Sequence, residues 1–247
     1  MNMRDMFEAE GNWLFRRRSF LPLLLTPLLV VAFQKYSYPL GSHSCDLLWE
    51  MICLTVSGTG FCIRALTSGF VPGKTSGRTT RKGQQAELLN TEGMYSIMRH
   101  PLYAGNFFVG LGFALFFFLW WAALAYVVAF WLYYERIIFA EEEFLRKQHG
   151  DSFDAWAART PAFLPAVSRW QTPELRFSVR TFLKREYRTF FLIFMVFTAL
   201  EILSDVRVER KVIVDLFWGI GFVISSLIWI VLRILHKRTH VLNAIGR

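Results

Sequence analysis

The stretch LYAGNFFVGLGFALFFFLWWAALAYVVAFWLYY, residues 102–134, decides the fold, because its 33 residues include no charged side chain. As one straight helix it would be about 50 Å long at a rise of 1.5 Å per residue. The hydrocarbon core of a bilayer is only about 30 Å thick. We therefore expect two antiparallel helices that fold back near Leu119-Trp120-Trp121, although no glycine, proline or charge marks a turn there.

Four further apolar runs approach the length of about 20 residues that a membrane-spanning helix needs. They cover residues 20–40, 45–63, 187–203 and 212–235. The sequence therefore predicts an all-α, polytopic transmembrane helical bundle of about six spans. The basic Arg16-Arg17-Arg18 before the first run is typical of a signal peptide, but no small-x-small cleavage pattern follows, so we expect an uncleaved anchor.

The composition agrees with this class. Hydrophobic residues make up 54% and aromatic residues 17% of the 247 residues, and the mean hydropathy is +0.33. So much apolar material excludes a disordered chain. The net charge of +9 suits a nucleic-acid partner, but the long apolar runs argue against one. Cys45, Cys53 and Cys62 lack C-x-x-C spacing, so we expect small packing residues, no disulfide and no metal site.

The basic residues predict the topology. With both termini in the cytoplasm, 24 of the 28 Lys and Arg residues fall in cytoplasmic segments, as the positive-inside rule requires. We divide the chain into an N-terminal segment with two anchor spans (1–63), a core with the helical hairpin (64–165), and a basic connector with a C-terminal two-span hairpin (166–247).

Polar residues converge at the cytoplasmic face of the hairpin. The block GMYSIMRHPLYAGN, residues 93–106, leads into its first helix, and Pro101 suits the first helical position. The fold-back brings YYER, residues 133–136, and EEE, residues 141–143, to the same face. Each group alone is consistent with a solvated charge run or an interface anchor. Together they predict a site, because ionisable groups near membrane depth are functional candidates.

A basic loop precedes this block and carries Lys74, Arg78 and Arg81. With Arg17 and Arg18 these residues are candidates for binding an anionic lipid headgroup at the membrane surface. The alternative is that they reflect only the positive-inside bias.

At these residues the sequence resembles the integral-membrane methyltransferases, a superfamily that includes isoprenylcysteine carboxyl methyltransferases and phospholipid N-methyltransferases. Their hallmark, Gly-x-Tyr-x-x-x-Arg-His-Pro-x-Tyr-x-Gly, is matched from Gly93 to Gly105 without a gap. A second hallmark is an acidic pair followed by a leucine, an aromatic pair and a Pro-x-x-x-Pro end. Its matches are Glu141-Glu142, Leu145, His149-Gly150, Phe153, Trp156 and residues 161–165.

The resemblance implies S-adenosyl-L-methionine as cofactor. By motif, the cofactor-binding residues would be Tyr95, His100, Tyr103, Gly105, Glu141 and Glu142, and the catalytic residues Arg99, Glu142 and Arg136. Arg136 stands one position earlier than the family's arginine, and His149 replaces a common phenylalanine. The spans after residue 187 lie beyond the shared block.

The arrangement is also similar to bacterial lipid A 1-phosphate methyltransferases, which implies a bacterial inner membrane with the site facing the cytoplasm. We expect O-methylation of an anionic group on a membrane lipid or lipidated substrate, such as the lipid A 1-phosphate. The alternatives are isoprenylcysteine carboxyl O-methylation, phospholipid N-methylation, an NADPH-dependent membrane reductase of related fold, and a non-catalytic scaffold.

Overall fold

The computed structural model describes residues 2–17, 26–73, 75, 78–80, 83–85, 87–212 and 214–244. Helices dominate this part of the chain, as the sequence predicts, and one short antiparallel pair of strands joins them. The elements in chain order are α1 (Met3–Arg17), α2 (Thr26–Gln34), α3 (His43–Phe70), β1 (Arg78–Thr80), β2 (Gly83–Gln85), α4 (Met94–Ile97), α5 (Pro101–Leu115), α6 (Trp120–His149), α7 (Asp151–Arg159), α8 (Val179–Val208) and α9 (Leu216–Arg238). Short 3-10 turns cover Pro39–Gly41 and Val167–Arg169.

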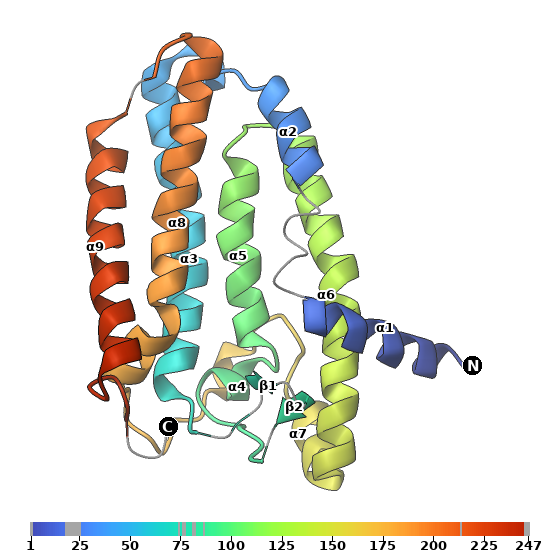
Figure 1. The fold of residues 1–247 in the computed structure, drawn as a ribbon. Coiled ribbons are helices and arrows are strands. Elements are labelled where there is room, and N and C mark those ends of the chain that lie inside the picture. The colour runs from blue at the N-terminus through green and yellow to red at the C-terminus, as the bar shows by residue number, and fades with distance from the viewer. Residues whose placement is uncertain are drawn as a thin grey trace.

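The predicted hairpin is present as α5 and α6, which run side by side and join through residues 116–119 (Figure 1). Phe118 adopts a positive φ of 52° in this turn. Trp49 on α3 supports it, because its Nε1 donates to the carbonyl of Leu115 at 2.8 Å and its ring meets Phe118 edge to face at 5.0 Å. A contact from another helix thus accounts for a turn that lacks glycine and proline.

Four helices among the described residues are long and apolar enough to cross a membrane: α3, α6, α8 and α9. α5 is shorter, about 22 Å at 1.5 Å per residue. The first predicted span shows only α2, with nine residues, and residues 18–25 lie outside the described part of the chain. The count of six spans and the orientation of the termini therefore stay predictions.

Small residues let α3 and α5 pack backbone to backbone. A Cβ on Gly60 would lie 2.4 Å from the carbonyl oxygen of Gly105, and a Cβ on Gly112 would collide with Ser57. Ser57 Oγ donates to the carbonyl of Val109 at 2.9 Å across the same interface. Such contacts between small residues stabilise helix pairs in lipid, where no hydrophobic effect drives association.

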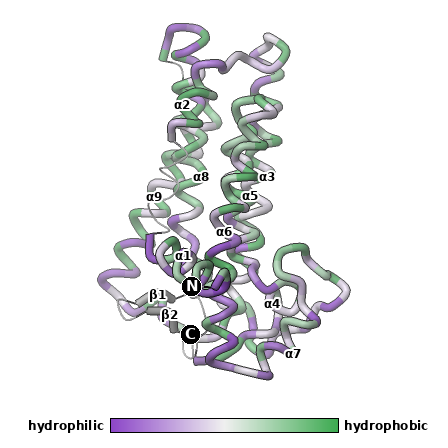
Figure 2. The backbone as a smooth tube through the Cα atoms, turned by 90° about the vertical axis from the view of Figure 1, so that its right-hand side faces the viewer, coloured by the Kyte–Doolittle hydropathy of each residue, from purple (hydrophilic) through white to green (hydrophobic). Residues whose placement is uncertain are grey.

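Hydrophobic residues cover the middle of the bundle, whereas hydrophilic segments gather at its lower end and in the loops at its upper end (Figure 2). The lower end holds α4, α7 and the strands, together with the ends of the hairpin where the sequence places its polar block (Figure 1). α8 packs against α3 and α9, so the C-terminal hairpin belongs to the same bundle as the core.

Candidate active site

The first motif changes direction three times within a few residues. Gly93 takes a φ of 58°, which favours glycine, and starts the single turn of α4. Met98 is extended, and His100 then caps α5, whose first residue is Pro101. Proline fits this position because its missing N–H would have no helical partner there. The motif therefore sets Arg99 and His100 at the lower mouth of the hairpin.

Backbone hydrogen bonds join the two motifs directly. The N–H of Arg99 donates to the carbonyl of Pro161 at 2.9 Å, and the N–H of His100 donates to Ala162 at 3.2 Å. Further along, the N–H of Ala166 donates to Ile97 at 2.9 Å. The Pro-x-x-x-Pro end thus runs beside the Arg-His-Pro segment and forms one wall of the mouth.

The Arg99 guanidinium ties this wall to α6. Its Nε donates to Glu142 Oε1 at 2.7 Å, and its Nη1 donates to the carbonyls of Ala157 and Thr160 at 2.9 and 2.7 Å. His100 Nε2 lies 2.8 Å from the same Glu142 oxygen. Glu142 is therefore engaged by two residues of the first motif, and it holds the Arg-His pair in place.

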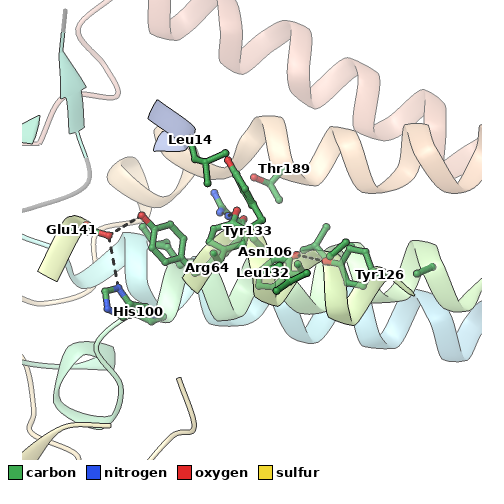
Figure 3. Close-up of a pocket in the computed structure, with 18 of the residues that line it drawn as sticks. Leu14, Arg64, His100, Asn106, Tyr126, Leu132, Tyr133, Glu141 and Thr189 are labelled. Atoms are coloured by element: carbon green, nitrogen blue, oxygen red, sulfur yellow. Dashed lines mark hydrogen bonds and ion pairs between the residues drawn. The ribbon is translucent and has the colours of Figure 1, made fainter. Parts of the chain in front are cut away.

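Glu141 occupies a different position, at the polar end of a pocket. Tyr103 donates its hydroxyl to Glu141 Oε2 at 2.7 Å, and His100 Nδ1 lies 3.8 Å from that oxygen. The rings of His100 and Tyr103 stack at 5.6 Å. Figure 3 shows both contacts of Glu141 as dashed lines. These contacts fix the position of the Glu141 carboxyl oxygens at the edge of the pocket.

Tyr95 and Trp156 add aromatic surface next to this carboxylate. Trp156 Nε1 donates to the carbonyl of Tyr95 at 3.0 Å, which joins α7 to α4. Burial, and then the nearby charge of Glu141, raise the pKa of the Tyr95 hydroxyl, so it stays neutral.

The pocket has a volume of about 990 Å³ and runs from His100 and Glu141 along α5 and α6 to Tyr126 (Figure 3). Its lower end is polar and aromatic. Its upper part is apolar. It is lined by side chains of α2, α5, α6 and α8 and of the turn between α5 and α6, among them Leu28, Leu29, Phe113, Phe117, Ala122, Ala129, Phe130 and Leu192. One cavity therefore joins a polar mouth to an apolar channel between the candidate membrane-spanning helices α6 and α8.

Arg64 and Glu186 are pocket-region residues that sequence reasoning missed. Arg64 lines the pocket and forms a two-point ion pair with Glu186 of α8, at 2.8 and 3.1 Å. Its third nitrogen donates to Asn106, whose amide donates in turn to Tyr134. The only sequence signal for this pair is that each residue interrupts or borders an apolar helix. The C-terminal hairpin thus takes part in the pocket through α8.

The structure separates the predicted site residues into two groups. Tyr95, Arg99, His100, Tyr103 and Glu141 line the pocket, and Glu142 pairs with two of them.

The second group lies elsewhere. Gly105 faces α3, where a Cβ would lie 2.4 Å from Cγ of Arg64, so its small size serves helix packing. Arg136 lies in the contact of α6 with α1: it pairs with Glu10 and Glu135, and its guanidinium is 3.9 Å from the centroid of the Phe7 ring.

The predicted headgroup residues are largely untested. Arg17 ends α1 and lies exposed over the ring of Trp13. Arg18, Lys74, Arg81 and the side chain of Arg78 lie outside the described residues.

The comparisons with known proteins concern this same region. Residues 74–152 match the phospholipid methyltransferase family. The chain is 29% identical over 86 residues to the protein-S-isoprenylcysteine O-methyltransferase of Schizosaccharomyces pombe, covering 35% of this chain and 36% of that protein. It is 34% identical over 80 residues to protein-S-isoprenylcysteine O-methyltransferase B of Arabidopsis thaliana, covering 32% and 41%.

A bacterial relative matches as well. The nickel-cobalt-cadmium resistance protein NccN of Alcaligenes xylosoxydans xylosoxydans is 40% identical over 92 residues, covering 36% of this chain and 42% of that protein. The chain thus spans less than half the length of the curated relatives it matches, and no solved structure matches. Residues 74–152, which contain the Arg-His-Pro motif and the acidic pair, are therefore similar in sequence to integral-membrane methyltransferases.

Proposed function

We propose that this protein is an integral-membrane methyltransferase that transfers a methyl group from S-adenosylmethionine to an anionic oxygen of a membrane lipid or lipidated substrate. One observation carries the proposal: both family motifs are hydrogen-bonded around one end of a cavity whose other end is apolar and is lined by the candidate membrane-spanning helices α6 and α8. Such a cavity suits a polar cofactor at the mouth and a hydrocarbon chain above it.

The side chains at the mouth fit the groups of the cofactor. Glu141 offers a buried carboxylate to a cation, and Tyr95 and Trp156 offer aromatic faces to a purine. His100 and Arg99 offer N–H donors to the carboxylate of the cofactor. When bound, the cofactor supplies a methyl group on a cationic sulfur, and its transfer to an anionic oxygen leaves a neutral thioether with no proton to remove.

The chain contributes mainly alignment. Tyr103 and His100 fix Glu141, and the Arg99–Glu142 pair fixes the wall beside it. Holding two reactants in a reactive geometry can supply about 7–11 kcal/mol of the barrier. An anionic acceptor needs no general base, which agrees with a site whose titratable groups are already engaged in holding one another.

Two acceptors compete within this proposal. The basic cytoplasmic face favours an anionic headgroup such as the lipid A 1-phosphate, whereas two relatives are named for O-methylation at isoprenylcysteine. Both are anionic oxygens joined to long hydrocarbon chains, which the apolar channel accommodates. Phospholipid N-methylation differs, because a neutral amine must lose a proton.

Cofactor binding tests the reaction class. We expect detergent-solubilised protein to bind S-adenosylhomocysteine in calorimetry, and Glu141→Gln to weaken that binding at least tenfold. Glu135→Gln is the matched control, since Glu135 is exposed on the same helix, pairs with Arg136 and does not line the pocket. Binding of NADPH without S-adenosylhomocysteine would refute the proposal and favour a reductase.

Labelled methyl transfer then distinguishes the acceptors. Lipid A, a prenylated cysteine and phosphatidylethanolamine are offered separately, and the product is identified by its gain of one CH₂ in mass spectrometry. Label in lipid A supports O-methylation of a phosphate, and label in the prenylated cysteine supports O-methylation of a carboxylate. Label in the amine alone would overturn the assignment to an anionic oxygen.

A further inference from the structure

A second polar cluster lies at the opposite end of the bundle from the candidate active site, where α3 begins and α8 ends (Figure 1). Asp46 and Glu50 stand one turn apart on α3, and Glu201 and Asp205 stand one turn apart on α8. Residues four apart share a helix face, so each helix presents two carboxylates. All four side chains are buried, with exposed fractions of 0–2%.

The hydrogen-bond donors around these carboxylates are neutral. Tyr36 donates its hydroxyl to Asp46 at 2.7 Å, Tyr38 donates to Asp205 at 2.8 Å, and Trp218 Nε1 donates to Glu50 at 2.8 Å. In the described part of the chain, no Lys or Arg forms an ion pair with any of the four. Buried carboxylates are normally paired with a cation or coordinate a metal.

The carboxyls of Glu50 and Glu201 lie close enough to each other to share a hydrogen bond through one proton. Three carboxylate oxygens accept no hydrogen bond from an N–H or O–H group of another residue type in the described part of the chain: Glu50 Oε1, Glu201 Oε2 and Asp205 Oδ2. These atoms are buried, so bulk water does not satisfy them. One oxygen from each of Asp46, Glu50 and Glu201 lies within 4.8 Å of the other two. A set of His43, Glu201 and Asp205 meets the same condition, and His43 is exposed. The cluster thus extends from a buried centre to the surface.

We propose that Asp46, Glu50 and Glu201 bind a divalent cation, with Asp205 and His43 on the side that opens to the surface. Carboxylate oxygens suit Mg²⁺, Ca²⁺ and Mn²⁺, and Mn²⁺ also accepts the nearby imidazole. The cation would neutralise a cluster that forms no ion pair with a described Lys or Arg, and it would join α3 to α8. Through the Glu50–Trp218 hydrogen bond it would also tie in α9.

This site is separate from methyl transfer, because it lies at the other end of the helices and shares no residue with the pocket. The sequence shows no compact ligand motif for it. The four carboxylates of the cluster form two pairs at i and i+4 on helices about 150 residues apart, and only the packing of α3 on α8 brings them together. The prediction that the chain has no metal site was based only on the spacing of Cys45, Cys53 and Cys62.

Mn²⁺ binding to the full chain in detergent, after treatment with EDTA, tests the proposal. We expect one Mn²⁺ per chain by electron paramagnetic resonance of the free ion, and a rise in Tm on its addition. Glu201→Gln is expected to weaken Mn²⁺ binding at least tenfold. Glu209→Gln is the matched control, since it removes an exposed carboxylate at the same end of α8 without removing a cluster oxygen.

A shared proton is the competing explanation for the unpaired oxygens. In that case Glu201→Gln, which resembles a protonated carboxyl, keeps or raises the Tm, and neither EDTA nor Mn²⁺ changes the Tm of the unaltered protein. That result overturns the proposal. If Glu201→Gln and Glu209→Gln weaken Mn²⁺ binding equally, the proposal is also overturned, because the ion would then be attracted only by the overall negative charge. A Glu201→Gln variant that fails to fold leaves the EDTA and Mn²⁺ response of the unaltered protein to decide.

Discussion

Gly60 is the position where one methyl group should disturb both the fold and the site. A Cβ there would lie 2.4 Å from the carbonyl oxygen of Gly105 and 2.6 Å from the amide nitrogen of Val109. Both are backbone atoms of α5, so no side chain can turn aside. Ordinary contact begins near 3.4 Å, so the helices must separate by about 1 Å, and overpacking of this kind costs about 1–3 kcal/mol.

Gly60→Ala also gains about 1 kcal/mol of helix propensity, which leaves a net loss of roughly 0–2 kcal/mol in the free energy of unfolding. Activity should fall much further. α5 begins at the mouth beside His100 and carries Tyr103, and a misplacement of about 1 Å at a reacting centre can cost about 10²-fold in rate. Denaturation in mixed micelles and labelled methyl transfer measure the two effects.

Gly58→Ala is the control on the same helix. Nothing lies within 4 Å of a Cβ at Gly58, so this variant should gain up to about 1 kcal/mol and keep its activity. If Gly60→Ala matches Gly58→Ala in both stability and rate, the close approach of α3 and α5 does not position the site and the reasoning is wrong.

Three further changes probe other contacts. Arg136→Ala should leave the affinity for S-adenosylhomocysteine unchanged. It should lower the free energy of unfolding by at most about 1 kcal/mol, because the pair of Arg136 with Glu10 is partly exposed. A tenfold loss of affinity in calorimetry would show that Arg136 does contribute to the site. Glu186→Gln should destabilise the protein by about 3–5 kcal/mol in denaturant titration, since it leaves Arg64 without a counter-ion, and an unchanged titration midpoint contradicts this. Ala129→Phe narrows the channel, so KM should rise for long-chain acceptors and not for short ones, with cofactor affinity as the internal control.

The sequence predicted most of what depends on length and local pattern. The charge-free run of residues 102–134 is too long for one span, and the hairpin α5–α6 follows from that length. Because the hairpin returns α6 to the lower end, the sequence also predicted that His100 lies near Glu141 and Glu142. The roles of the individual residues stay predictions until binding is measured.

What the sequence could not supply depends on the rotation of each helix and on partners far along the chain. Arg136 is five residues before Glu141, yet that offset turns it toward α1. The pairing of Arg64 with Glu186 requires α8 to pack on α3, and no local pattern indicates which helices are neighbours.

The backbone hydrogen bonds of the mouth also set an order on biosynthesis. Arg99 and His100 donate to Pro161 and Ala162, and Ile97 receives its bond from Ala166. A ribosome that has translated the whole hairpin has still not made the segment 161–166 that closes the wall. Until residues 161–166, which follow α6 in the sequence, have been made, the backbone N–H groups of Arg99 and His100 and the carbonyl of Ile97 lack these partners. The mouth is therefore completed only after both helices that frame it have been made.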